Sequence, residues 1–172
     1  MAIANYFYNQ TTRKYVAIFG TLFNQLSIQR VNAQGTTFQT AIVPLSYAPF
    51  QKILARVEQD ANLNRQSAIT LPRMSFEITS MQYDGERRIS VRHKIPKTLR
   101  ESDSSLNYVY AGAPYNLEFS LYIMAKYQED ATKIVEQIIP FFQPDFTVSA
   151  KLIENLPPLD VPIILNSVVN EE

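Results

Sequence analysis

Residues 73–95, RMSFEITSMQYDGERRISVRHKI, carry the clearest local signal in the sequence. Asp84-Gly85 is a favoured two-residue turn, and apolar and polar residues alternate on both sides of it. Counting outward from this turn, Tyr83 faces Glu86 and Glu77 faces Arg92. One face of the resulting ribbon would be apolar, formed by Met74, Phe76, Ile78, Ile89, Val91 and Ile95. A half-buried antiparallel hairpin over 73–95 is therefore predicted.

A second strand signal follows at residues 115–125, where apolar and polar residues first alternate strictly and then become apolar on both faces. This change favours a central strand. The next segment has helical spacing, with Glu129 and Asp130 in its first turn, where carboxylates complement the positive end of a helix. Its expected buried stripe consists of Ala131, Ile134, Val135, Ile138 and Ile139.

That helix runs into a stiff corner within KIVEQIIPFFQPDF, residues 133–146. Pro140 and Pro144 each restrict their own backbone and that of the preceding residue, so the corner points Phe141 and Phe142 in set directions. Two interpretations stay open. Both rings pack in the core beneath the corner, or one points inward while the other contacts a neighbouring protein.

The remaining segments complete an α+β pattern. A helix is expected from a threonine cap at Thr12 to Leu26, a hairpin over 26–31 and 36–45 with Pro44 at a strand end or edge, and a second helix over 46–62. Residues 97–112 are interpreted as a long polar loop, and strands at 146–153 and 161–169 as joined by a stiff loop at 155–158. The prediction is one domain over 1–172, with a mainly antiparallel β-sheet flanked by about three helices.

Composition excludes several functional classes. Sixteen basic residues balance sixteen acidic ones, so no global charge attracts the chain to nucleic acid or to an anionic membrane. The absence of cysteine excludes disulfides, thiolate catalysis and cysteine-ligated zinc. No apolar run is long enough for a membrane span, and the first ten residues lack the pattern of a signal peptide. We therefore expect a soluble, non-secreted protein.

The sequence contains no recognisable catalytic set. Phosphate-binding loops, nucleophile elbows and metalloprotease motifs are absent, and we expect no cofactor and no metal site. His93, the single histidine, faces Phe76 in the predicted hairpin and is interpreted as a strand residue at the edge of the core. Glu129 and Asp130 point in different directions from a helix, so they are poor paired carboxylates.

Residues 87–100, RRISVRHKIPKTLR, show the strongest local charge bias, with six basic residues and no acidic residue. One interpretation is a solvated strand face and loop. The other is a contact with an acidic protein surface or with nucleic acid. Nucleic acid is the weaker version, because no aromatic residue interleaves the basic run as a stacking platform would. The candidate contact residues are Arg88, Arg92, Lys94, Lys97 and Arg100.

Several segments together resemble a known family. They are YFYNQTTRKYVAIFGTLFNQLSIQR near the amino terminus, VPLSYAPF and ITLPRMSFEI in the middle, YNLEFSLYIMAKYQEDATKIVEQIIPFFQPDFTVSAKL after them, and DVPIIL near the end. Their order and content resemble the tail sheath stabiliser, or tail completion protein, of T4-like contractile-tailed bacteriophages. The resemblance covers nearly the whole chain and is densest at residues 113–148.

The resemblance implies a tail-terminator-like fold and a structural protein of the virion. It implies a homohexameric ring that caps the head-proximal end of the tail, terminates tube and sheath, stabilises the extended sheath and joins the head. The implied partners are further copies of the chain, tail tube and sheath proteins, and head-completion or neck proteins. It also implies assembly in the bacterial cytoplasm and DNA passing through the channel without specific binding.

Two hypotheses about contacts follow from the implied ring. Phe141 or Phe142 would approach a neighbouring subunit, and the basic segment with the loop at 97–112 would contact tail or neck proteins. Members of the family usually continue beyond the segment that matches DVPIILNSV, and we expect ring closure and head joining to depend on whether that stretch contributes contacts. The alternative function is a nucleic-acid-binding module that uses residues 87–100, and it predicts duplex binding that weakens steeply with salt.

Overall fold

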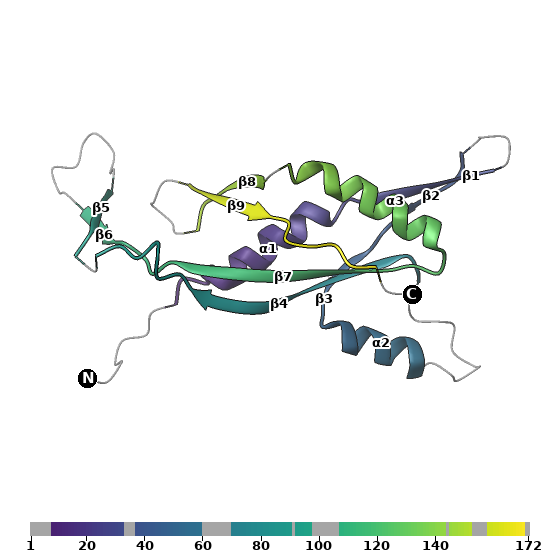
Figure 1. Ribbon diagram of the computed structural model, residues 1–172, viewed down its shortest axis with the longest axis horizontal. Helices are drawn as coiled ribbons and strands as arrows, with labels where there is room; N and C mark the ends of the chain where they lie inside the picture. The colour runs from purple at the N-terminus through teal and green to yellow at the C-terminus, as the bar shows by residue number, and fades with distance from the viewer. Residues whose placement is uncertain are drawn as a thin grey trace.

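The structure is a computed structural model and describes residues 8–32, 37–59, 70–90, 92–97, 107–143, 145–152 and 158–170. Its centre is a three-stranded sheet in the order β3-β4-β7 (Figure 1). The middle strand β4 (Arg73–Tyr83) pairs in parallel with the short β3 (Leu45–Tyr47) and antiparallel with β7 (Tyr115–Met124). Both strands predicted at 73–83 and 115–125 are confirmed, but β4 and not β7 is central.

The hairpin predicted over 73–95 is wrong, because β4 pairs with β7 and not with residues 86–95. Phe76 lies opposite Leu121 and Glu77 opposite Ser120. The chain does turn at Asp84, whose carboxylate accepts hydrogen bonds from the backbone N–H groups of Glu86 (3.0 Å) and Arg87 (3.3 Å). This turn directs the chain away from β4. The pairing with β7 also places larger apolar side chains on the buried face than residues 89–95 would supply.

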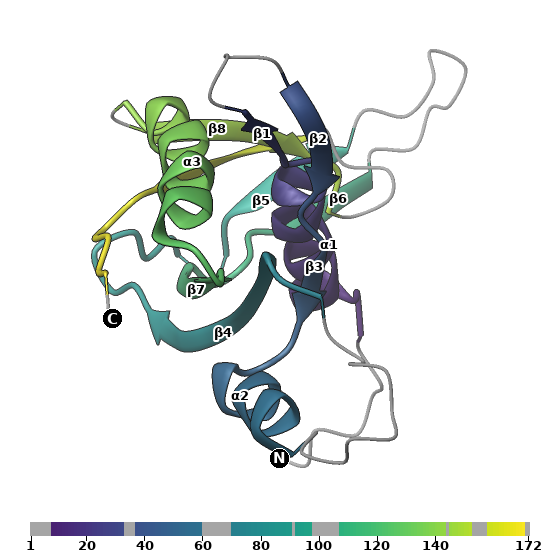
Figure 2. The same cartoon turned by 90° about the vertical axis from the view of Figure 1, so that its right-hand side faces the viewer.

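The core lies between the sheet and two helices on one face, α1 (Thr11–Phe23) and α3 (Gln128–Ile138) (Figure 2). The ring of Phe19 stacks on that of Phe119, with centroids 4.5 Å apart, and lies 5.1 Å from that of Phe76. A Cβ atom on Gly20 would approach the Phe76 ring to 3.3 Å, so glycine allows α1 to pack closely on β4. The fully or nearly fully buried members of this core are Phe19, Phe23, Ile28, Val43, Met74, Phe76, Ile134 and Ile138.

The opposite face of the sheet carries α2 (Phe50–Gln59) and is more polar. The ring centroids of Phe50 and Tyr122 are 5.2 Å apart, and Ile53 is buried. The Tyr122 hydroxyl donates a hydrogen bond of 3.0 Å to the carboxylate of Glu77. The sheet therefore has one aromatic and aliphatic face and one mixed face.

Three two-stranded antiparallel ribbons surround this centre. They are β1 (Ser27–Val31) with β2 (Thr37–Ile42), β5 (Lys94–Lys97) with β6 (Asn107–Tyr110), and β8 (Asp145–Ala150) with β9 (Leu159–Ile164). Figure 1 shows β5 and β6 beyond the ends of β4 and β7, whereas β1 and β2 reach the opposite end of the molecule. β5 pairs with no strand other than β6 in the part of the chain that the structure describes.

The predicted α+β class is confirmed, as are the hairpin that β1 and β2 form and the last strand pair. The helix predicted from Thr12 to Leu26 is also confirmed, but it begins at Thr11 and ends at Phe23, so Thr12 is no cap. Gln10 precedes the helix with φ 56° and makes no capping hydrogen bond through its side chain.

Three predicted segments differ from the structure in their bounds. The last strand, predicted over 161–169, is β9 and ends at Ile164. The second helix begins only at Phe50, because residues 45–47 form β3. The predicted loop over 97–112 contains a strand, since residues 107–110 form β6. Four predicted parts of the chain lie outside the described residues. They are the turn at 33–35, the end of the second helix at 60–62, residues 98–106 of the loop, and the loop at 155–157.

Candidate functional site

The corner after α3 separates its two phenylalanine rings. The helix continues into a short 3-10 turn, η1 (Ile139–Phe141), which contains Pro140. Phe142 is half-buried and stacks toward the core, with its ring centroid 6.4 Å from that of Phe23. Phe141 keeps 64% of its surface exposed and touches Phe146 edge-on at 6.4 Å. One ring of the corner thus packs inward while the other lies at the surface.

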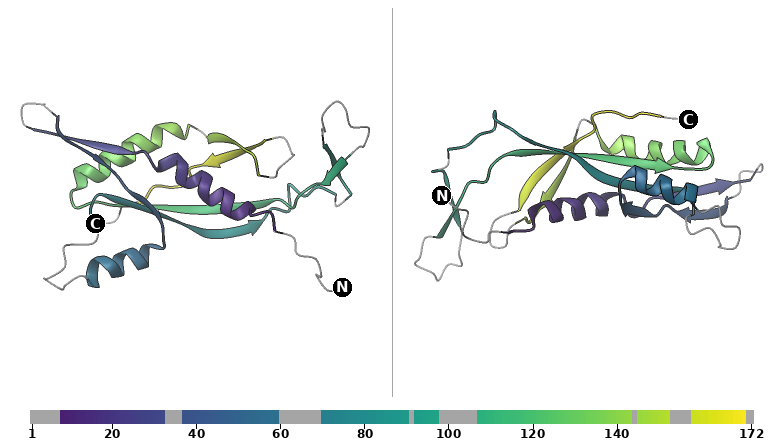
Figure 3. Two further views of the ribbon diagram at one scale, coloured as in Figure 1. Left: turned by 180° about the vertical axis from the view of Figure 1, so that it is seen from behind. Right: turned by 90° about the horizontal axis from the view of Figure 1, so that it is seen from below.

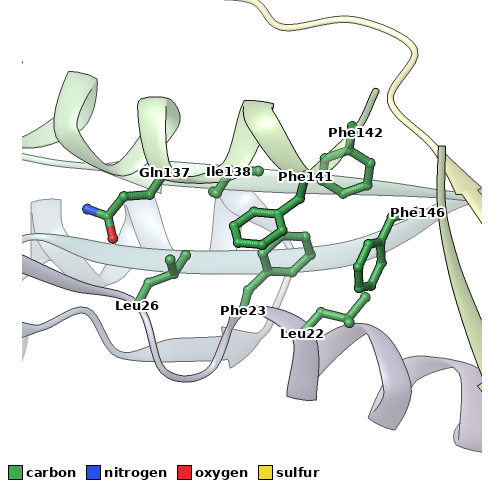
Figure 4. A pocket seen from close by; sticks show the side chains of 8 residues that line it. All are labelled: Leu22, Phe23, Leu26, Gln137, Ile138, Phe141, Phe142 and Phe146. Carbon is green, nitrogen blue, oxygen red and sulfur yellow. The ribbon is translucent and has the colours of Figure 1, made fainter. Parts of the chain in front are cut away.

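An apolar hollow of about 110 Å³ lies beside these rings. Figure 4 shows the rings of the corner and of Phe146 on one side and α1 side chains on the other. The hollow is lined by Leu22, Phe23, Leu26, Gln137, Ile138, Phe141, Phe142 and Phe146. Gln137 is the single polar lining residue. The arrangement offers binding surface for an apolar or aromatic group and has no groups for acid–base chemistry.

A wider polar groove adjoins the hollow and shares Gln137 with it. The other lining residues are Ser27, Gln29, Lys133 and Glu136. The Lys133 ammonium forms an ion pair with Glu129 and donates to the Gln29 carbonyl at 3.3 Å. Glu136 is exposed on the same helix. The groove therefore places an exposed carboxylate next to the apolar hollow.

Asp130 anchors β1 to the helix that forms the hollow. Asp130 as a whole residue is 3% exposed. Its carboxylate accepts a hydrogen bond of 2.6 Å from the Arg30 guanidinium. This hydrogen bond raises the pKa of Arg30, so the guanidinium stays charged. The sequence indicated only a contact between Asp130 and the helix dipole. The ion pair was not predicted, because Arg30 is 100 positions away and no local spacing signals it.

The basic segment lies at the end of the molecule that carries β5, far from β1 and β2 (Figure 1). Arg88, Arg92 and Lys94 all face solvent, whereas Arg87 forms an ion pair with Asp84. The hydrogen bond from the Arg87 side chain holds the pKa of Asp84 below its usual value. Lys97 lies in β5, and Arg100 lies outside the described residues.

Aromatic rings accompany this basic segment across the β5–β6 ribbon. The Lys94 ammonium lies 3.8 Å from the ring centroid of Tyr108 and 5.7 Å from that of Tyr110, within the range of a cation–π contact. Sequence reasoning did not predict this contact, because it assigned both tyrosines to a loop. The strand register that pairs Lys94 with Tyr110 brings them together.

His93 has a different position from the one predicted. It precedes β5 and is exposed, and its backbone N–H donates to the Ser90 carbonyl at 2.9 Å. It therefore does not pair with Phe76 at the core edge. Within the described ranges, no three metal-ligating side chains gather in a group that could hold an ion. None of the helices in those ranges is both long and apolar enough to span a membrane.

Comparison with known proteins identifies the family. A family model described as the tail sheath stabiliser of T4-like Myoviridae viruses matches residues 6–172. The tail completion protein gp15 of Enterobacteria phage T4 is 27% identical over 175 residues, which cover 97% of this chain and 63% of the T4 protein. The chain thus spans less than two thirds of the length of that relative. Because the family match extends over nearly every residue, the chain belongs to the T4-like tail sheath stabiliser family.

Proposed function

We propose that six copies of this chain form a closed ring that caps the head-proximal end of a contractile phage tail. The ring ends growth of tube and sheath, stabilises the extended sheath and provides a surface for the head or neck proteins. The proposal is supported by the family match and by the name of the T4 relative, a tail completion protein. The family is one of structural tail proteins, and the protein would accordingly act in the virion tail or neck after assembly in the host cytoplasm.

The observation that carries the proposal is the extent of exposed apolar surface. Large apolar side chains are exposed on several elements, including Ile42, Tyr83, Tyr110, Phe141, Ile164 and Val169. Aromatic side chains are enriched in the buried centres of protein interfaces. A subunit that buries these side chains against neighbours and against the tail fits this surface better than a free monomer.

A second candidate is the nucleic-acid-binding module, and the contact of Lys94 with Tyr108 favours it, since basic and aromatic groups together bind single strands. It predicts affinity for nucleic acid that falls steeply as salt rises. Fluorescence anisotropy with a labelled duplex and a labelled single strand would measure this affinity. Absence of binding at low salt would exclude it.

The proposed function is tested on tails that lack their head-proximal cap. Purified protein is added to tube–sheath assemblies, which are then imaged by electron microscopy and diluted to follow sheath loss. We expect a ring at one end of each tail and slower loss of the sheath than in tails without added protein. Protein that binds along the sheath or not at all would contradict the proposal.

A further inference from the structure

From the positions of the arm and the hollow, we infer that the β5–β6 end of one copy docks into the apolar hollow beside Phe141 of the next copy. We call this end the arm and define it as residues 84–90, 92–97 and 107–114. The inference rests on the proposed function, since it assigns the contact that joins neighbouring subunits of the ring. It also revises the expectation that the basic segment contacts tail or neck proteins.

The arm has the composition of a docking element, and its β5–β6 ribbon pairs with no further strand among the described residues. Tyr108 and Tyr110 are 50% and 59% exposed, and Ile89 and Ile95 are exposed in the same arm. A two-stranded ribbon by itself is marginally stable in water. Figure 3 shows the arm standing away from the helices in both views. Burying the tyrosines against another copy would stabilise the ribbon.

The hollow has the lining to accept part of one of these rings. Its volume of about 110 Å³ is smaller than the roughly 150 Å³ of a closed cavity that holds one benzene ring, but the hollow is open to the surface, so an entering ring can stay partly outside it. Because Phe141 stands exposed at its edge, an incoming tyrosine would complete an aromatic cluster with Phe141 and Phe146. Aromatic pairs of this kind are favourable beyond the area that they bury.

Charge complementarity supports a second copy as the occupant. Residues 87–100 contain six basic and no acidic residues, whereas residues 124–172 contain eight acidic and three basic residues. The arm exposes Arg88 and Arg92, and Glu136 is exposed next to the hollow, with Asp145 at the start of β8. Exposed arginines therefore lie on the arm, and the exposed carboxylates of Glu136 and Asp145 lie on α3 and β8 near the hollow. Such surfaces attract between copies.

The two surfaces differ, so their contact is head-to-tail. Each copy would offer its arm to one neighbour and its hollow to the other, and a contact of this type closes into a ring when the rotation between copies is correct. The rigid corner after α3 would then fix the angle at which the arm enters. The contact needs no cofactor and no covalent step.

A disulfide test uses the absence of cysteine from the chain. The variant Tyr110→Cys/Gln137→Cys places one thiol on the arm and one in the hollow, and mild oxidation should give a ladder of covalent oligomers up to six copies. The matched control Lys52→Cys/Gln137→Cys moves the first thiol to the exposed face of α2 and should stay monomeric on a denaturing gel. A wild-type hexamer with no more crosslinking in the test pair than in the control would overturn the inference and leave the ring intact.

A charge-swap test separates the inference from the proposed function. Arg88→Glu/Arg92→Glu should weaken association by about tenfold or more, and adding Glu136→Arg/Asp145→Arg should restore it. The control Lys52→Glu/Lys126→Glu has the same change in net charge at two exposed positions outside the arm and should associate like the wild type. If the arm variant still forms hexamers but fails to bind tails, the basic segment contacts a tail or neck protein and the inference is wrong. A wild-type chain that never associates, even on tails, would contradict both.

Discussion

Asp130 is the buried half of an ion pair that links α3 to β1. Replacing it with asparagine leaves the Arg30 guanidinium without a carboxylate partner. Removing one partner of a buried ion pair usually destabilises a fold by more than the intact pair stabilises it, because the remaining charge is unpaired. We expect Asp130→Asn to lower the denaturant midpoint several times more than Glu129→Gln does. Glu129 is the matched control, because its side chain is 74% exposed and its pair with Lys133 is worth no more than about 0.5 kcal/mol. Equal effects in urea unfolding would contradict the anchoring role.

Asp84 provides a prediction for pH. The hydrogen bond from the Arg87 side chain holds the pKa of Asp84 below its ordinary value of 3.8, and hydrogen bonds from backbone N–H groups lower this pKa further. The pKa of Asp84 is lower in the folded chain than in the unfolded chain. The interactions of its carboxylate therefore stabilise the fold fully above pH 3.8, and this stabilisation is lost as the pH falls through the pKa of the folded state. NMR titration of the Asp84 carboxyl should therefore give a midpoint below 3.8. In Arg87→Gln the midpoint should rise, and no difference between the two chains would contradict this interpretation.

At the scale of elements, the pairing of β4 with β7 is the feature that sequence reasoning missed. Glu77 faces Arg92 in the predicted hairpin and Ser120 in the observed sheet. Because the chain contains no cysteine, pairs of introduced cysteines can distinguish the two arrangements. Glu77→Cys/Ser120→Cys joins residues that face each other and should form a disulfide on oxidation. Glu77→Cys/Arg92→Cys tests the hairpin register and should remain reduced. The reverse result, measured by mass spectrometry, would restore the hairpin.

The corner and the core should respond differently to loss of a ring. Phe76 is 4% exposed and contacts Phe19 and Tyr47, so Phe76→Ala should destabilise the fold by about 3–5 kcal/mol. Phe141 is largely exposed, so Phe141→Ala should change stability by about 1 kcal/mol or less. The second variant should nevertheless associate less tightly than the wild type. Large destabilisation by Phe141→Ala in chemical unfolding would make that ring part of the core.

The elements also show what a sequence can predict. Periodicity located α1, α3 and β7, because their apolar residues recur at the spacing of the element and each buries one face. Which strands pair with one another was harder to predict. Asp84-Gly85 is a real turn signal, but local turn chemistry does not reveal that a strand 30 or more positions away offers better packing. The aromatic groups around Lys94 were missed for the same reason, since β6 lies within a polar segment with weak alternation.

At the scale of the whole molecule, two features agree with an assembling subunit. Large aromatic and aliphatic side chains stay exposed on several elements, and opposite charges are separated along the sequence although the totals balance. The resemblance to tail sheath stabilisers could be stated from sequence alone, and the family match confirms it. The hollow, and the different environments of Phe141 and Phe142, could be seen only in the structure. The prolines in the sequence restrict the backbone directions at the corner, but they do not reveal which residues each ring contacts.

The central claim is that this chain assembles with itself into a hexameric ring. Native mass spectrometry or light scattering across a concentration series tests it most directly. We predict a species of six times 19.7 kDa, about 118 kDa, that persists on dilution and is weakened in Arg88→Glu/Arg92→Glu. A species of 19.7 kDa at every concentration, with and without tail assemblies present, would contradict the account.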